Sequence, residues 1–370
     1  MNRNTMDSGQ PTPQQVPPSS HTADTRPRLR KWHLPFLLML AVGSYLAITH
    51  KISQQTPYQR HEGTIFGTVF HTTYQSDTLL TSDILAVLHD VDRSLSMFNP
   101  QSTISQINSS RSDRTDSLLE QVMEIATTVS KDTEGAFDVT VAPLVNAWGF
   151  GFKHGIRPDS LQVDSLRALV GWQRVGIVNH RFVKDDPAMV VDLSAVAKGF
   201  ATDRVAALFA SKDIRNYMIE IGGEIVARGV NPKNQPWRIG VNKPDDDSTS
   251  TNNELQTILR MHDCALATSG NYRNYYIAEG RKIAHTIDPR TGYPVQHSIL
   301  SSTVVAPDCA TADAYATAFM VLGLDKAREV LARNPKLKAY FIYDTPQGYR
   351  VWMSEALKKD IDQQSAHSIH

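Results

Sequence analysis

Residues Ser302–Gly323 read STVVAPDCATADAYATAFMVLG and join a strand pattern to a helix pattern. Apolar, β-branched residues predict a strand over Ile299–Val305, and Thr311–Leu322 predicts the helix that follows. Thr311 can cap this helix. Asp313 and Thr317 stand four positions apart, so their side chains project from the same helix face. The segment therefore predicts a strand that leads into a helix carrying a carboxylate and a hydroxyl side by side.

Strand and helix patterns alternate on both sides of this segment. Helical spacing predicts helices over residues 82–98, 116–133, 160–170, 195–210 and 325–334. Strand patterns cover residues 64–74, the VVDL of 190–193, residues 216–226 with a break at Gly222-Gly223, and residues 237–241, 255–259, 265–268, 339–343 and 348–353. There is no regular βαβ spacing and no repeat. The order predicts an α+β fold with mixed, mostly antiparallel sheets and flanking helices.

Composition excludes several classes of protein. Lys and Arg together number 38, as do Asp and Glu, so binding of nucleic acid through bulk positive charge is excluded. Hydrophobic residues make up 41% of the chain, which is ordinary for a globular protein with a core. Cys264 and Cys309 are too few for a zinc site or a disulfide scaffold. One disulfide between them is possible, but the sequence does not predict it.

An uncharged apolar run, Leu34–Ile48, follows a basic cluster that ends at Lys31. This pattern is typical of a secretory signal or a signal anchor. Because no A-x-A cleavage pattern follows, the sequence favours an uncleaved anchor. The basic flank predicts that the N-terminus lies inside and the bulk of the chain outside. We expect a disordered cytoplasmic tail over residues 1–31, the signal anchor or signal peptide over 32–50, a linker over 51–62, a catalytic domain over 63–359 and a flexible tail over 360–370.

The richest local motif is AHTIDPRTGYPV, Ala284–Val295. Asp-Pro followed by Thr-Gly is typical of a tight turn. His285 and Asp288 flank this turn, and both are groups for proton transfer or metal binding. A well-formed hairpin loop without chemistry is the alternative reading of the same residues.

Two other motifs contain chemical groups. Asp313 and Thr317 offer hard oxygen donors, which suit Mg²⁺ better than zinc or copper, although an ordinary helix with an acidic first turn explains them too. In VDLSAVAKGFATDRV, Val191–Val205, a strand pattern runs into a helix. The free amides of such a helix start can bind an anion such as pyrophosphate, and Lys198 can add positive charge. A routine strand-to-helix connection is the alternative here.

Taken together, the motifs resemble the FAD:protein FMN transferase (ApbE) family, formerly described as thiamine-biosynthesis lipoproteins. The resemblance spans about Gly63 to Met353 and is carried, in the family's order, by GTIFGT, SMFNPQSTISQIN, GAFDVTVAPLVNAWGFG, VDLSAVAKGFATDRV, IGGEI, ATSGNY, HTIDPRTGYPV and TADAYATAFMVLG. It implies an ApbE-like fold, related to the T-fold. It also implies that Mg²⁺ and FAD bind, that a threonine hydroxyl of a target protein attacks the phosphorus on the FMN side, and that AMP leaves.

The resemblance also implies roles for individual residues. The metal ligands are Asp313, Thr317 and the backbone carbonyl of Ala195. His285 is the catalytic base, with Asp288 as the competing candidate or as a group that orients the loop. The flavin site draws on Phe66, Phe98, Ala136, Phe137, Asp138, Asp192, Lys198 and Ile287.

This sequence departs from the family at two positions. Phe66 replaces the usual Met, and Phe98 replaces the usual Tyr, which removes one hydroxyl from the flavin pocket. The implied partner is an extracytoplasmic redox protein that carries the target threonine. The expected location is the bacterial inner membrane, with the N-terminus in the cytoplasm and the catalytic domain in the periplasm or otherwise outside the cytoplasm. An FAD pyrophosphatase and a flavin carrier without chemistry are the alternatives.

Overall fold

The computed structural model describes residues 33–53, 56–150, 158–242, 255–271, 275–278, 281–296 and 299–362. The chain divides into two compact units, Met1–Gln55 and Thr56–His370. The described part of the first unit is helix α1, His33–Ser53. In the ranges above, no helix combines the length and the apolar character needed to cross a membrane. The expected tail over residues 1–31 lies outside the described residues.

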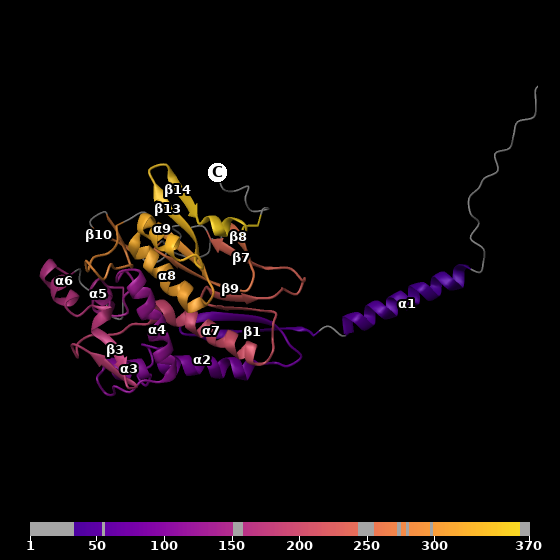
Figure 1. Ribbon diagram of the computed structural model, residues 1–370, viewed down its shortest axis with the longest axis horizontal. Coiled ribbons are helices and arrows are strands. Elements are labelled where there is room, and N and C mark those ends of the chain that lie inside the picture. The colour runs from indigo at the N-terminus through magenta and orange to yellow at the C-terminus, as the bar shows by residue number, and fades with distance from the viewer. Residues whose placement is uncertain are drawn as a thin grey trace, which may run out of the picture. The chain divides into compact units, whose positions relative to one another are not determined.

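The second unit is built on an eight-stranded sheet (Figure 1). Its strands run in the order β1-β2-β5-β6-β9-β12-β13-β14. Their bounds are β1 Tyr58–Ile65, β2 Thr68–Gln75, β5 Tyr217–Ile221, β6 Glu224–Arg228, β9 Cys264–Gly270, β12 Ile299–Ala306, β13 Lys338–Thr345 and β14 Gly348–Met353. Each neighbouring pair in this sheet is antiparallel.

Three two-stranded hairpins accompany the large sheet. They are β3 Val175–Val178 with β4 Arg181–Lys184, β7 Trp237–Asn242 with β8 Leu255–Met261, and β10 Tyr275–Ala278 with β11 Arg281–Ala284. These pairs are antiparallel as well. The predicted α+β fold with mostly antiparallel sheets is therefore confirmed.

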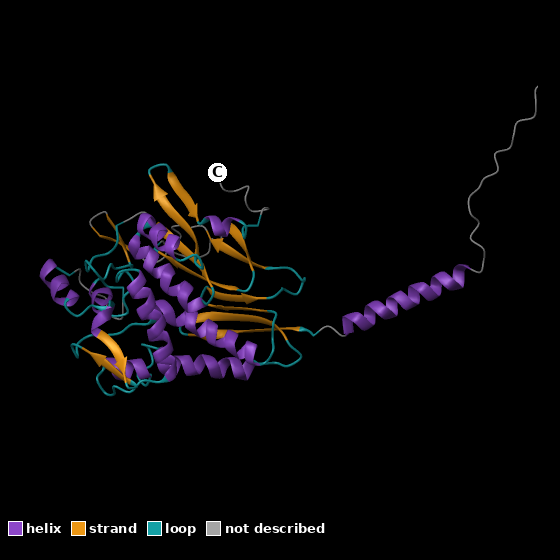
Figure 2. Cartoon of the chain, viewed as in Figure 1, coloured by secondary structure: helices purple, strands orange, loops and turns teal. Residues whose placement is uncertain are grey.

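Helices cover one face of the sheet in two layers (Figure 2). In the inner layer, α7 (Ser194–Ser211) lies on β5 and β6, and α8 (Cys309–Leu322) lies on β9 and β12. The two inner helices also contact each other (Figure 1). The outer helices α2 (Thr81–Leu95) and α4 (Ser117–Asp132) pack on this inner pair. The remaining elements are α3 Thr103–Asn108, α5 Ala142–Ala147, α6 Ser160–Arg167, η1 Trp172–Arg174, α9 Leu324–Arg333 and α10 Glu355–Lys358.

The core lies on both faces of the large sheet. The main cluster lies between the sheet and the helices, with Phe70, Phe209 and Phe319 fully buried. The opposite face packs against the β7–β8 hairpin and α10 through residues such as Trp237 and Leu357. Burial of apolar area on both faces is the main force that holds these layers together. Both cysteines are free, so the one disulfide that the sequence allows is not formed.

The single strand predicted over residues 64–74 is wrong. The chain instead turns back at Phe66 and Gly67, which have φ angles of 52° and 73°, and forms the β1–β2 hairpin. Two consecutive residues with positive φ match the twist of a two-residue hairpin turn. Phe-Gly is a weak turn signal because Phe rarely adopts positive φ, and the strand pattern runs on through the turn without a break.

The strand predicted over residues 190–193 is also wrong, because this segment has no strand partner. A side chain takes the partner's place: the amide of Val191 donates to Asn108 Oδ1 at 2.9 Å, and Asn108 Nδ2 donates to the Val191 carbonyl at 2.8 Å. The amide of Asp192 donates to the carbonyl of Val139 at 2.7 Å. The apolar pattern here reports burial and not sheet pairing.

Two predicted boundaries shift as well. The linker expected over residues 51–62 contains the last residues of α1, up to Ser53, and the first residues of β1, from Tyr58. The flexible tail expected from residue 360 begins as ordered chain, because Ile361 pairs with Leu259 and Asp362 lies 2.9 Å from Arg238. In the second place the pairing partner of Ile361, Leu259, lies about a hundred residues earlier in the chain, so no local pattern marks it.

Candidate active site

The loop after β11 carries His285 and holds Asp288 in place through hydrogen bonds. The amide of Gly292 donates to the Asp288 carbonyl at 2.8 Å, and the amide of Asp288 donates to the Tyr293 carbonyl at 2.9 Å, which closes the turn predicted from Asp-Pro-Arg-Thr-Gly. Arg290 donates to both carboxylate oxygens of Asp288, at 2.9 and 2.8 Å. This geometry gives Asp288 a partner inside the loop and favours the orienting role among those predicted for it.

His285 is half-buried, and its ring centroid lies 6.3 Å from that of Phe150. Two contacts dock its loop onto motifs that are distant in sequence. Trp148 Nε1 donates to the Gly292 carbonyl at 2.9 Å, and Thr286 Oγ1 donates to Asn271 Oδ1 at 2.6 Å. Three of the motifs recognised in the sequence therefore meet around His285.

Asp313 and Thr317 lie on α8, as predicted, on the side that faces α7 and the sheet. Asp313 is buried, and its Oδ2 accepts the amide of Gly199 at 3.1 Å. Thr317 Oγ1 is 3.0 Å from Ser269 Oγ on β9. In an α-helix the amide of residue 199 normally pairs with the carbonyl four residues earlier, that of Ala195. The Asp313 carboxylate therefore accepts from the same α7 amide that an ideal helix would pair with the Ala195 carbonyl.

An ion pair between a half-buried lysine and a buried acid lies beside this junction. Lys198, on α7, donates to Glu224 Oε1 at the start of β6, and Glu224 is only 3% exposed. Burial and the charge of Asp313 raise the pKa of Glu224 to about 8, although Lys198 lowers it. Burial lowers the pKa of Lys198, but the charges of Asp313 and Glu224 outweigh it and the pKa is raised. Lys198 is therefore held cationic between two acids.

The donors at this junction fit a hard cation. Burial raises the pKa of Asp313, and Lys198 and the Gly199 amide offset this only in part. The second carboxylate oxygen of Glu224 is buried without a hydrogen-bond partner. In the described ranges no three His, Cys, Asp or Glu side chains are grouped to hold a metal. A metal here would therefore depend on one carboxylate, the Thr317 hydroxyl and a backbone carbonyl, which are oxygen donors of the kind that Mg²⁺ takes.

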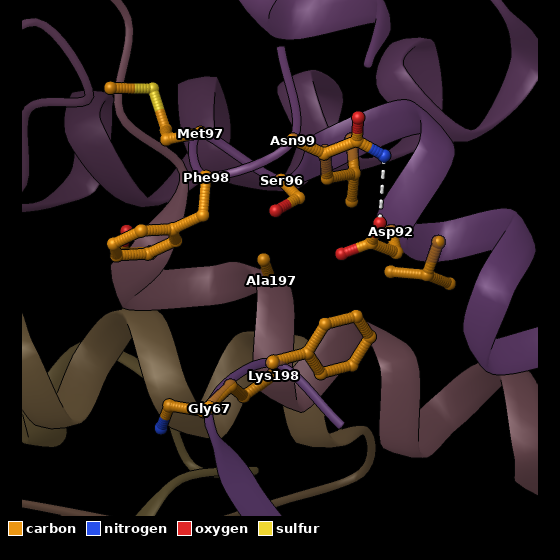
Figure 3. Close-up of a pocket in the computed structure, with 12 residues that line it drawn as sticks. Gly67, Asp92, Ser96, Met97, Phe98, Asn99, Ala197 and Lys198 are labelled. Atoms are coloured by element: carbon orange, nitrogen blue, oxygen red, sulfur yellow. Dashed lines mark hydrogen bonds between the residues drawn. The ribbon is translucent and has the colours of Figure 1, made fainter. Parts of the chain in front are cut away.

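A cavity of about 610 Å³ opens next to Lys198 (Figure 3). Its volume lies within the usual range for small-molecule sites, roughly 300–1,000 Å³. Figure 3 shows Phe98 and Lys198 on opposite sides of it, with Ala197 between them, and Asn99 bonded to Asp92 at 2.8 Å. Phe66, in the β1–β2 turn, also lines the cavity, and Phe98 is 75% exposed. Three of the predicted flavin-site residues thus share one cavity.

The other predicted flavin-site residues do not line this cavity. Ala136 and Phe137 are buried, and Ile287 packs in a small cluster with Leu144, Trp148 and Val163.

Two of these remaining residues are acids that hold local structure. Asp138 accepts the hydroxyl and amide of Thr140 and the amide of Trp172. Burial raises the pKa of Asp138 despite these bonds. Asp192 accepts the amide of Ser194 at 2.8 Å, at the start of α7. The structure thus places Asp192 at the N-terminus of the helix that carries Lys198.

Sequence reasoning missed Glu224 and Ser269, although both lie in motifs that it singled out. The signal for Glu224 was an acid directly after Gly222-Gly223 inside an apolar strand, because a buried acid needs a charged or hydrogen-bonded partner. Ser269 had no local signal, since its contact with Thr317 spans 48 residues of sequence.

The chain matches the ApbE family model over residues 66–341. A Haemophilus influenzae protein named FAD:protein FMN transferase is 37% identical over 340 residues, which cover 87% of this chain and 96% of that protein. An Escherichia coli protein of the same name is 37% identical over 276 residues, which cover 72% of this chain and 77% of that protein.

Two solved structures have the same architecture. The flavin transferase ApbE from Vibrio cholerae aligns with a TM-score of 0.73 and 33% identity, over 82% of this chain and 100% of that one. The apo form of the Pseudomonas stutzeri flavinyl transferase ApbE aligns with a TM-score of 0.74 and 29% identity, over 83% of this chain and 97% of that one. Since the family model spans more than half of the chain and these relatives match it at this identity, the chain belongs to the ApbE family and is an enzyme of the transferase class.

Proposed function

We propose that this chain transfers the FMN part of FAD onto a threonine hydroxyl of a target redox protein, that the reaction requires Mg²⁺, and that AMP is released. The observation that carries the proposal is the α7–α8 junction. There, the cavity-lining Lys198 is followed directly by Gly199, whose amide binds the buried carboxylate of Asp313. Positive charge, oxygen donors and a cavity of suitable size thus meet at one place.

Lys198 supplies charge to the pyrophosphate of FAD. Its ammonium is held by Glu224 at the cavity wall, so it needs little reorganisation when a phosphate binds. Asp313, Thr317 and the Ala195 carbonyl would hold Mg²⁺ beside it. When bound, this ion would neutralise charge on the phosphoryl oxygens.

His285 is the proposed general base. The threonine oxygen forms a bond to the phosphorus on the FMN side, and the bond from that phosphorus to the oxygen of AMP breaks. The threonine proton passes to His285, and AMP leaves with the bonding electron pair as a phosphate monoester. A hydroxyl is a weak nucleophile, so removal of its proton by a positioned base accelerates attack.

The test is a transfer assay with the purified full chain, FAD, Mg²⁺ and a candidate acceptor protein. Mass spectrometry of the acceptor should show an added FMN on a threonine, and AMP should appear in equal amount. Asp313→Ala should abolish the metal-dependent reaction while FAD still binds. Release of FMN and AMP without modification of the acceptor would instead identify an FAD pyrophosphatase. FAD that stays intact would identify a flavin carrier.

We further infer that residues 32–50 act as a signal anchor or signal peptide and place the catalytic domain outside the cytoplasm, at the bacterial inner membrane. The uncharged run after a basic flank supports this. Protease added to intact spheroplasts should digest the catalytic domain. Protection of that domain until the membrane is lysed would contradict the inference.

A further inference from the structure

The two halves of the candidate metal site lie on different helices. Helix α7 carries Ala195 and Lys198, and α8 carries Asp313 and Thr317. A carbonyl on one helix and a carboxylate on the other can share an ion only if the helices keep a fixed separation and register. Mg²⁺ makes this demand strict, because its ligands lie at about 2.0–2.1 Å in near-octahedral geometry.

Asp203 connects α7 to the first turn of α8. Its carboxylate accepts the amide of Cys309 at 2.8 and 2.9 Å, through its two oxygens, and the amide of Ala310 at 2.8 Å. The first amides of a helix have no partner within the helix. Here α7 provides that partner, whereas the next amide, that of Thr311, is capped by Asp308 at 2.8 Å from the residue just before α8.

Gly199 lies one turn before Asp203 on the same face of α7. A Cβ at Gly199 would stand 2.3 Å from the carbonyl oxygen of Cys309, so the backbones of the two helices are in direct contact there. Gly199 therefore sets how closely α7 and α8 approach, and Asp203 sets where the first turn of α8 lies along α7.

We propose that Asp203 is a positioning residue, which fixes the register of α8 against α7 so that Asp313 and Thr317 face the Ala195 carbonyl. The proposal rests on the proposed function, because it takes these three groups as the metal ligands. Asp203 is not one of these ligands and acts through the Cys309 and Ala310 amides of α8.

The experiment measures metal affinity in the absence of turnover. Mn²⁺, which takes the same oxygen donors, is titrated into the purified full chain without FAD, and free Mn²⁺ is followed by electron paramagnetic resonance. Asp203→Asn should weaken Mn²⁺ binding by about tenfold to a hundredfold, the usual scale for groups that orient metal ligands. The matched control is Asp308→Asn, which removes the negative charge of the Thr311 cap on the same helix and leaves the bridge from Asp203 to α8 in place. The control should lower the thermal midpoint and leave the Kd for Mn²⁺ unchanged.

Three outcomes would overturn the proposal. If Asp203→Asn binds Mn²⁺ as the wild type does, Asp203 is only a helix cap. If both variants weaken binding equally, loss of helix stability explains the effect. If the wild type binds no Mn²⁺, the proposed metal site is wrong and this inference fails with it. A wild type that binds Mn²⁺ together with an Asp203→Asn variant that binds it equally well would contradict this inference alone.

Asp203→Glu provides a second variant in case Asp203→Asn does not fold. It keeps the charge and moves the carboxylate by one methylene. Its Kd for Mn²⁺ should rise while its thermal midpoint stays close to that of the wild type. An unchanged Kd in this variant would also contradict the proposal.

Discussion

His285 and Asp288 lie on one loop, but their surroundings differ. Asp288 accepts hydrogen bonds from Nε and Nη2 of Arg290, whereas the ring of His285 lies edge-on to that of Phe150. We expect His285→Ala to slow FMN transfer by roughly a hundredfold or more, the usual scale for a general base, and to leave FAD binding intact. Single-turnover transfer rates and FAD titrations measure the two effects separately.

Asp288→Asn is the matched comparison for this residue. It should lower stability, because Arg290 loses a charged partner, and should change the transfer rate much less than His285→Ala does. A larger loss of rate in Asp288→Asn, with His285→Ala near the wild-type rate, would transfer the base role to Asp288.

Single residues could be assigned from the sequence only where a local motif marked them. Asp313 and Thr317 were predicted as neighbours because helical spacing alone puts them on one face. Glu224 was not, although it forms the ion pair that holds Lys198. An acid in a strand gives no indication of its partner when that partner lies on a helix packed over the sheet.

Helix packing is decided at Gly199. We expect Gly199→Ala to destabilise the fold by about 1–3 kcal/mol or more, the usual cost of overpacking, because its Cβ would stand 2.3 Å from the Cys309 carbonyl oxygen. Urea unfolding measures the change. The same variant should weaken Mn²⁺ binding, since α8 must move away from Ala195.

Gly176→Ala is the control for this substitution. Gly176 lies in β3, and the nearest atom to its added Cβ is Val183 Cγ2 at 4.0 Å, an ordinary contact. It should leave stability and metal binding near their wild-type values. Equal destabilisation by both substitutions would show that the α7–α8 contact is not specially tight.

The elements themselves followed from periodicity where one face is buried. The predicted helices over residues 116–133 and 195–210 agree with α4 and α7 to within one residue at each end. The β1–β2 turn was missed because a hairpin turn at Phe66 and Gly67 depends on backbone φ angles that the alternation of side chains does not report.

The stability of the whole molecule should depend on the ionisation of Asp203. Removal of water raises its pKa from 3.8 to about 7, even though the Cys309 and Ala310 amides lower it. Between these two values the folded chain binds more protons at this site than the unfolded chain does. Its contribution is therefore fully present below pH 3.8 and is lost as the pH rises to about 7. The wild type should thus lose stability relative to Asp203→Asn over this window.

Urea unfolding of both proteins at several pH values between 5 and 8 checks the sign. Taking the difference between the two proteins cancels the other titrating groups that they share. A difference that stays constant, or that grows in favour of the wild type as the pH rises, would contradict the assignment.

The sequence by itself determined the class of fold, the pairing of Asp313 with Thr317 on one helix face, the turn around Asp288 and the family. These depend on residue spacing within short segments, where period and turn chemistry act locally. Tertiary structure alone decided the site: Lys198 meets Glu224 across 26 residues, Cys309 meets Asp203 across 106, and Asp313 meets the Gly199 amide across 114. Such contacts arise when buried faces of α7, α8 and the sheet pack together, and no local pattern encodes which partner a polar group will find.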